Sequence, residues 1–315
     1  MSPASQAIAD VTFIVPTLRR PDFLTRCLRA IAGQSLPVKE VLVGIRADDT
    51  VSGPALHEFK DRLNLRAVEA RGVGVVGSMN SCLREAQATY VGLLDDDVEL
   101  PPQWVATMVR HLESDPAALG VGGRDFLQDH PEMRRTEPLV HDVGRVHWYG
   151  RITGNHHRGS GQLRRVQVLR GSNCLFRGDF LREIGFESKL RGRGAQVNWE
   201  LAIALEALRR RRPLLYDPTL EVLHHVAPRH DSDQVHRGRF VAEGISDIAF
   251  NETFVTKAHA PALAMVPLIG WQFLVGTRTC PGLLNVLRIS LAREPHVWSR
   301  TVTTLRARVA ALRAN

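Results

Sequence analysis

The sequence lacks the features that define several classes of protein. Its 315 residues include few cysteines, which lie far apart and form no C-x-x-C pair, so neither a disulfide scaffold nor a cysteine-built zinc site is expected. No uninterrupted run of 18 or more apolar residues occurs, which argues against a transmembrane helix. The opening MSPASQAIAD lacks the cationic start and apolar core of a signal peptide. We therefore expect a cytoplasmic protein with reduced, mostly buried thiols at Cys27, Cys82, Cys174 and Cys280.

Acidic residues are outnumbered, because 33 Asp and Glu face 41 Lys and Arg, for a formal net charge of +8. Such a surplus suits an anionic partner: a nucleotide phosphate, a nucleic acid or an anionic lipid surface. Aromatic residues make up only 6% of the chain and the basic residues are scattered, so no stacking platform for nucleic acid is evident. We expect no nucleic-acid partner, and keep a non-catalytic nucleic-acid-binding protein as an alternative.

Apolar, β-branched segments alternate with amphipathic ones, a pattern that predicts a mostly parallel sheet with helices on both faces. A polar stretch at residues 127–165 is expected to form long loops with irregular strands. Strands are predicted within 11–18, 38–49, 65–70, 89–97, 118–125, 166–175 and 213–226, and helices within 19–35, 52–64, 74–88, 104–116, 176–186 and 198–212.

Polar side chains follow three of the predicted strands. They are Pro16 to Arg19, Arg46 to Asp49, and Asp95 to Asp97. In a parallel sheet the ligand lies beyond the carboxyl ends of the strands, so these segments should converge on one cleft.

Three adjacent carboxylates, Asp95, Asp96 and Asp97, directly follow the apolar segment YVGLL. Hard oxygen ligands suit Mg²⁺ or Mn²⁺, and such a cation removes the repulsion between the acids. The triplet therefore predicts a metal site, with a solvated acidic turn as the alternative. His224 and His225 end another strand-like segment, and the alternation of a strand lets only one of them face the cleft and complete the metal's ligands.

Four segments, in this order, resemble family 2 glycosyltransferases of the nucleotide-sugar-binding GT-A type. The resemblance covers roughly residues 11–230 and implies a GT-A, Rossmann-like sheet that is mixed but mostly parallel. It also implies an inverting transferase that moves a sugar from a nucleotide-diphosphate donor, most often UDP, in cell-surface glycan, glycolipid or natural-product biosynthesis. The segments are FIVPTLRRPDFLTRCLRAIAGQSLPVKEVLVG, GSMNSCLREAQATYVGLLDDDVELPPQW, LRGSNCLFRGDFLREIGF and GRGAQVNWELAIALEALRRRRPLLYDPTLEVLHH.

The resemblance also implies roles for individual residues. Asp97 binds the metal, with His224 preferred over His225 as a further ligand, and Asp96 at most orients the turn beside the nucleotide sugar. Asn173 and Trp199 fall on the acceptor and sugar side. The other positions that the resemblance assigns to the nucleotide sugar are Pro16, Thr17, Arg19, Asp48 or its neighbour Asp49, Asn80 and Asp95.

The chain departs from the family's pattern at the catalytic base. Many members carry an Asp where Asn198 stands, and an amide cannot take a proton at neutral pH. Glu200 lies two residues on and is the only carboxylate between Glu187 and Glu206. We expect Glu200 to deprotonate the acceptor hydroxyl. The alternative is that Glu200 pairs with an arginine of the basic surface nearby.

The predicted organisation is a catalytic domain at 1–235, with a nucleotide-sugar half at about 11–125 and an acceptor half at about 126–235. A helical extension follows at 236–315, and its basic end suits peripheral attachment to the inner face of the plasma membrane. The alternative is a helical subdomain that packs on the catalytic core or makes a homodimer. The expected acceptor is a glycan, a lipid-linked molecule or a small molecule. A nucleotidyltransferase is an alternative, but the first strand is followed by PTLRRPDF, which has no glycine for a phosphate loop.

Overall fold

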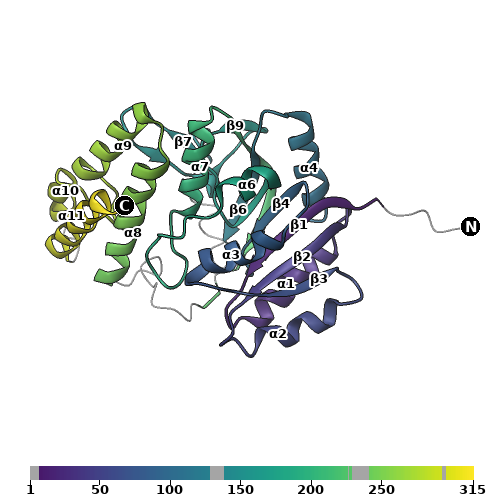
Figure 1. Ribbon diagram of the computed structural model, residues 1–315. Helices are drawn as coiled ribbons and strands as arrows, with labels where there is room; N and C mark the ends of the chain where they lie inside the picture. Colours follow the sequence, from purple (N-terminus) through teal and green to yellow (C-terminus); the bar gives the residue numbers. More distant parts are fainter. Residues whose placement is uncertain (1–6, 128–137, 226, 229–240, 293–295) are drawn as a thin grey trace, which may run out of the picture.

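The computed structural model describes residues 7–127, 138–225, 227–228, 241–292 and 296–315. A nine-stranded mixed sheet runs through its centre, and Figure 1 shows helices on both sides of it. Four strands at one side are parallel and lie in the order β3, β2, β1, β4. They are β1 (Ala9–Pro16), β2 (Val38–Ile45), β3 (Leu65–Glu69) and β4 (Tyr90–Leu94).

The second half of the sheet is mixed. Strand β10 lies antiparallel between β4 and β6, and β11 runs parallel to β6. The short strands β5 and β9 pair antiparallel with the two ends of β11. The bounds are β5 (Val98–Glu99), β6 (Gly120–Leu127), β9 (Arg164–Val166), β10 (Asn173–Arg177) and β11 (Leu214–His224).

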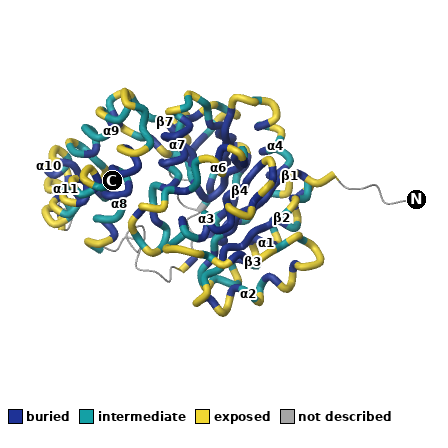
Figure 2. Tube along the Cα trace, viewed as in Figure 1, coloured by how far each residue is buried: buried dark blue, intermediate teal, exposed yellow. Residues whose placement is uncertain are grey.

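Alternation along the strands builds two cores. In β1, Phe13 and Val15 pack with α1 and α4 on one face, whereas Ile14 packs with α3, α6 and α7 on the other. Figure 2 shows that buried residues concentrate in these central strands. The helices are α1 (Pro21–Ala32), α3 (Gly74–Glu85), α4 (Trp104–Ser114), α6 (Gly178–Ile184) and α7 (Trp199–Arg209).

The predicted elements form, with three differences. The helix expected at 52–64 is reduced to α2 (Ser52–Ala55) and a 3-10 turn, η1 (Leu56–Phe59). Strand β4 ends at Leu94, so the acid triplet lies in the turn after it. The strand expected from residue 166 begins later, at Asn173.

The polar stretch from residue 127 holds a small hairpin and a 3-10 turn, while residues 128–137 lie outside the described part. The hairpin is β7 (Arg145–Val146) with β8 (Ile152–Thr153), and the turn is η2 (His156–Arg158).

The pairing of β11 changes register at Pro218. Asp217 lies opposite Gly123, but the next paired residue, Glu221, lies opposite Arg124. Proline has no N–H to donate to a sheet, so it favours such an irregularity. Beyond it, Leu223 pairs with Glu99 and His224 with Val98, which brings the end of β11 beside the acid triplet.

The C-terminal helices lie together at one end of the molecule (Figure 1). Helix α8 contacts both α7 and α11, so the extension packs directly on the catalytic half. In the described residues no helix is both long and apolar enough to span a membrane. The domain boundary predicted at residue 235 falls outside the described residues and stays a prediction. The helices are α8 (Ala242–His259), α9 (Ala262–Leu274), α10 (Asn285–Leu291) and α11 (Val297–Arg313).

All four cysteines are buried and unpaired with one another. Burial raises the pKa of each thiol, to about 12 for Cys82 and Cys280. Cys280 belongs to the small apolar cluster of the C-terminal helices, and Cys27, Cys82 and Cys174 belong to the two cores of the sheet.

Candidate active site

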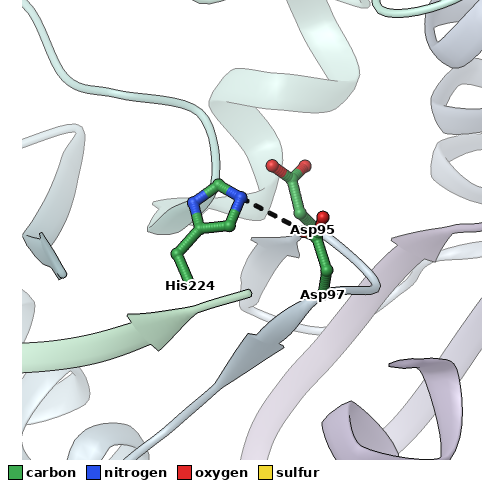
Figure 3. Close-up of side chains that lie close together, drawn as sticks. All are labelled: Asp95, Asp97 and His224. Carbon is green, nitrogen blue, oxygen red and sulfur yellow. Dashed lines mark ion pairs between the residues drawn. The ribbon is translucent and has the colours of Figure 1, made fainter. Parts of the chain in front are cut away.

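Asp95, Asp97 and His224 form a compact group at the carboxyl end of β4. One potential ligand atom from each lies within 4.8 Å of the other two. Figure 3 shows the imidazole and both carboxylates pointing toward one another, with His224 Nε2 at 3.2 Å from Asp97 Oδ1. Two carboxylates and an imidazole make a donor set that fits Mg²⁺ or Mn²⁺.

The three side chains of this group shift one another's pKa values. Burial and the charge of Asp97 raise the pKa of Asp95. Burial opposes ionisation of Asp97, but its hydrogen bond to His224 and the charges of His224 and Arg20 lower its pKa overall. Burial likewise opposes protonation of His224, yet Asp97 raises its pKa above the ordinary value. When protonated, His224 places between the acids the positive charge that a divalent cation would supply when bound.

Asp96 points to a different set of partners. Thr17 Oγ1 donates to its Oδ2 at 2.7 Å, and Arg20 Nη1 donates to its Oδ1 at 2.9 Å. Burial raises the pKa of Asp96 to about 7, although the charge of Arg20 opposes the shift. Asp96 thus connects the loop after β1 to the acid triplet, and its place beside the nucleotide sugar stays a prediction.

The side chains of the two adjacent histidines point to different partners, as the alternation of side chains along a strand predicts. His225 Nε2 lies 2.5 Å from Glu99 Oε1, and its ring is 6.4 Å from that of Phe23. Its backbone N–H donates to the carbonyl oxygen of Asp97 at 2.8 Å. His225 therefore fixes the backbone of the turn, and His224 is the histidine that faces the carboxylates.

Glu200 lies in the first turn of α7, and its Oε2 atom is buried without a hydrogen-bond partner. Burial raises its pKa, and the charge of Asp95 adds to the rise while Arg170 opposes it. No ion pair joins Glu200 to an arginine within the described residues. The nearby arginines pair with Glu206 and Glu183 instead.

Asn198 points away from this group. It caps α7 with a left-handed backbone, at φ 78°, which asparagine tolerates better than most residues. Its Nδ2 donates to the carbonyl oxygen of Ile248 in α8 at 3.3 Å. Trp199 lies in the core with its ring 5.7 Å from that of Phe186 and against Gly171, so its side chain packs rather than faces the cleft.

Sequence reasoning missed a buried network behind the acids. Asp125 lies within β6, where it pairs with Val222 of β11, and is 1% exposed. It accepts hydrogen bonds from Ser172 Oγ at 2.6 Å and Asn173 Nδ2 at 3.2 Å, and lies 3.0 Å from Arg170 Nε. Asn173 in turn accepts from Trp104 Nε1 at 2.8 Å. The signal for Asp125 was present, because it is another acid at the carboxyl end of a predicted strand.

Of the residues expected to contact the nucleotide, Asp49 is buried and Asp48 is exposed. Asp49 is buried and accepts from Arg19 N at 2.6 Å and Ser52 Oγ at 2.6 Å, so it holds the loop. Asp48 is exposed between Arg19 and Arg46. Pro16 ends β1 beside them.

Asn80 lies apart from these residues. Both ends of its amide bond the backbone of Phe186, at 2.8 Å and 3.0 Å, so it joins α3 to the segment after α6. Its predicted contact with the nucleotide stays a prediction.

The mixed, mostly parallel sheet and the acidic group at its carboxyl edge match the architecture that the GT-A resemblance implies. Residues 12–185, more than half of the sequence, match the family described as Glycosyl transferase family 2. The chain therefore belongs to glycosyl transferase family 2, which confirms the family resemblance expected from the motifs.

Named relatives match over part of their length. The chain is 28% identical over 120 residues to a hyaluronan synthase of Pasteurella multocida, covering 37% of this chain and 12% of that protein. It is 31% identical over 99 residues to a glucosyl-dolichyl phosphate glucuronosyltransferase of Haloferax volcanii, covering 30% of this chain and 28% of that protein. The chain thus spans well under two thirds of these relatives.

Solved structures share the fold. Staphylococcus aureus TarS 1-349 in complex with UDP-GlcNAc has a TM-score of 0.62 at 13% identity, covering 94% of this chain and 81% of TarS. The mannosyltransferase PcManGT of Pyrobaculum calidifontis, in complex with GDP-Man and Mn²⁺, has a TM-score of 0.54 at 17% identity, covering 98% and 88%.

Proposed function

We propose that the protein is a metal-dependent, inverting glycosyltransferase that uses a nucleotide-diphosphate sugar. The observation that carries the proposal is the group of Asp95, Asp97 and His224, together with Glu200 in the first turn of α7, whose Oε2 atom is buried without a hydrogen-bond partner. The nucleotide sugars and Mn²⁺ named with the structural neighbours support it. UDP is the nucleotide that we propose first.

Each residue then has a chemical role. Asp95, Asp97 and His224 would hold Mn²⁺ or Mg²⁺, which when bound neutralises charge on the departing diphosphate. Glu200 accepts the proton of the acceptor hydroxyl, the oxygen bonds to the anomeric carbon, and the bond from that carbon to the diphosphate breaks on the opposite face. Configuration at the anomeric carbon inverts. Arg170 and the buried Asp125 hold Ser172 and Asn173 at the edge of the site.

The proposal is tested by screening nucleotide sugars for thermal stabilisation with Mn²⁺ or Mg²⁺, because a ligand that binds only the folded state raises the melting temperature. The hit is then assayed for release of the nucleoside diphosphate with wild-type protein, Asp97→Asn and Asp61→Asn. Asp61 is an exposed acid outside the site. Metal-dependent release that Asp97→Asn loses and Asp61→Asn keeps supports the proposal. Consumption of nucleoside triphosphate with release of pyrophosphate would instead establish a nucleotidyltransferase.

We further propose that the C-terminal helices rest on an anionic membrane. Helix α11 exposes Trp298, Val302, Val309 and Leu312, whose spacings of four, seven and three place them on one face. Residues 276–315 contain seven arginines and one glutamate, a balance that favours anionic lipid headgroups. Apolar side chains are also exposed in α9, in α10 and directly before α10, at Leu263, Val266, Leu284, Leu287 and Leu291.

Sedimentation with vesicles tests this placement. Wild-type protein should sediment with vesicles containing phosphatidylglycerol, and a Trp298→Gln/Val302→Gln/Leu287→Gln variant should not. Absence of wild-type binding at physiological salt, with a dimer by light scattering that the triple variant breaks, would assign the face to self-association instead.

A further inference from the structure

A cavity of about 540 Å³ lies between the start of α3, the loop 188–196 and the start of α8. Four arginines line it, Arg71, Arg84, Arg191 and Arg193, together with two acids, Glu243 and Asp247. All four arginines are exposed residues. No ion pair joins any of the four guanidinium groups to a carboxylate within the described parts of the chain. The lining is therefore cationic.

The wall of the cavity is held in place by hydrogen bonds to the backbone. Gln196 is 4% exposed, accepts a hydrogen bond from Val76 N at 3.0 Å and donates one to Leu190 O at 3.0 Å. Gly74 has φ 65°, and a Cβ there would lie 2.3 Å from Gln196 Oε1, so only glycine lets the helix start meet the loop so closely. The Gln196 side chain and Gly74 therefore fix how the start of α3 meets the loop 188–196.

Two of the arginines are held at the rim. The guanidinium of Arg191 lies 3.5 Å from the centre of the Phe250 ring, and Arg84 Nη2 donates to Ser81 Oγ at 3.2 Å. Each contact occupies one face or one donor of the guanidinium, and the other donors can bind an anion. Arginine forks match carboxylate and phosphate oxygens in geometry as well as charge.

The position of the cavity connects it with the acceptor. Gln196 lies four residues before Glu200, so one loop forms the cavity wall and leads into the helix of the proposed base. Helix α3 follows β3 and therefore begins at the same carboxyl edge of the sheet as the acid triplet. We propose that this cavity binds an anionic group, a phosphate or a carboxylate, of the molecule that accepts the sugar. The assignment to the acceptor rests on the proposed function, whereas the anion site itself does not.

Inorganic phosphate is the probe for the site. The full chain is titrated with phosphate in the presence of EDTA and without any nucleotide sugar, so that no metal can draw phosphate to the acid triplet. Thermal shift and calorimetry are measured for wild type, for Arg71→Gln/Arg193→Gln and for a control of equal charge change, Lys60→Gln/Arg62→Gln. Lys60 and Arg62 are exposed and lie outside the cavity lining. Glucuronate replaces phosphate in a parallel series.

We expect saturable stabilisation of wild type and control, and affinity about tenfold weaker in the cavity variant. Stronger binding of phosphate than of glucuronate would identify a phosphorylated acceptor, and the reverse order an acidic sugar. Equal stabilisation of all three proteins, or none of wild type, would overturn the proposal. Because neither metal nor donor is present, this result is independent of whether the protein transfers sugar.

Discussion

At the scale of single residues, Glu200 combines two properties that rarely occur together without a function. Its Oε2 atom is buried without a hydrogen-bond partner, and its pKa is raised by burial and by the charge of Asp95. A buried carboxylate oxygen without a hydrogen-bond partner costs stability, which makes Glu200 a candidate for a functional role.

Replacing Glu200 by Gln should lower the kcat of transfer about 10²- to 10⁴-fold, because an amide cannot accept the acceptor's proton. The same change should raise the melting temperature at pH 7, since it removes the buried charge. Both are measured on one preparation by initial rates and by calorimetry.

Asn198→Asp is the matched control for that substitution. It restores the family's usual acid, but the carboxylate would face the carbonyl of Ile248, to which Asn198 Nδ2 now donates. We expect no recovery of rate in the Asn198→Asp/Glu200→Gln double variant. Full recovery would show that the base belongs at residue 198.

The raised pKa of Glu200 also predicts the direction in which kcat and the melting temperature change with pH. The base acts when deprotonated, so kcat should fall as pH drops through a value above 4.5, the ordinary pKa of glutamate. A carboxyl group whose pKa is raised in the folded state binds its proton more tightly in the folded protein than in the unfolded chain. The stability that this proton contributes to the folded state is therefore lost as the pH rises. The melting temperature of Glu200→Gln relative to wild type should therefore increase from pH 4 to pH 7. A difference that stays flat over this range would contradict the raised pKa.

At the scale of secondary-structure elements, helix α8 holds the loop that precedes α7. Asn251 of α8 is fully buried, accepts from Arg191 N at 2.7 Å, and donates to Arg191 O at 3.0 Å and Val197 O at 3.2 Å. Three hydrogen bonds from one amide thus fix the loop that leads to Glu200.

Asn251→Ala should cost about 1–3 kcal/mol of unfolding free energy, because buried backbone groups lose their partners. It should also lower kcat by letting the loop before α7 move. Asn251→Asp should be no better, since two of the three partners are carbonyl oxygens that need a donor. Chemical denaturation and steady-state kinetics measure both effects, and an unchanged kcat with lowered stability would separate the loop from catalysis.

Much of the first half of the sheet could be predicted from sequence because its strands are consecutive, apolar and parallel. The contact between Thr17 and Asp96 follows from the alternation of these strands with helices, which places both residues at the carboxyl edge of the sheet. The buried set around Asp125 could not be predicted, because it depends on β10 lying antiparallel between β4 and β6. The contact of His224 with Asp97 depends likewise on the pairing of β5 with β11. When strands that are neighbours in the sheet are not consecutive in the sequence, their pairing leaves no periodic pattern of residues from which it could be predicted.

At the scale of the whole molecule, a buried ion pair joins the C-terminal helices. Arg308 of α11 is fully buried and lies 3.2 Å from Glu252 of α8. It also donates to the carbonyl oxygens of Gln272 and, at 3.0 Å, Cys280. One side chain therefore connects α8, α9, α11 and the loop between α9 and α10.

Arg308→Met should destabilise the protein by about 3–5 kcal/mol, because it leaves Glu252 buried without its cation. Arg306→Met, on the exposed side of the same helix, should change stability little. Since α8 carries Asn251, loss of the pair should reduce transferase activity as well as stability. Destabilisation with full activity would show that the C-terminal helices fold independently of the site.

Labelling of the four buried thiols can be used to detect local or global unfolding of the protein. Each cysteine is shielded from solvent and has a raised pKa, so thiol-reactive reagents can reach it only after local or global unfolding. Cys280 monitors the C-terminal helices, and Cys27 monitors the sheet beneath α1. The order in which mass spectrometry finds them labelled in mild denaturant measures whether the two parts of the chain unfold together.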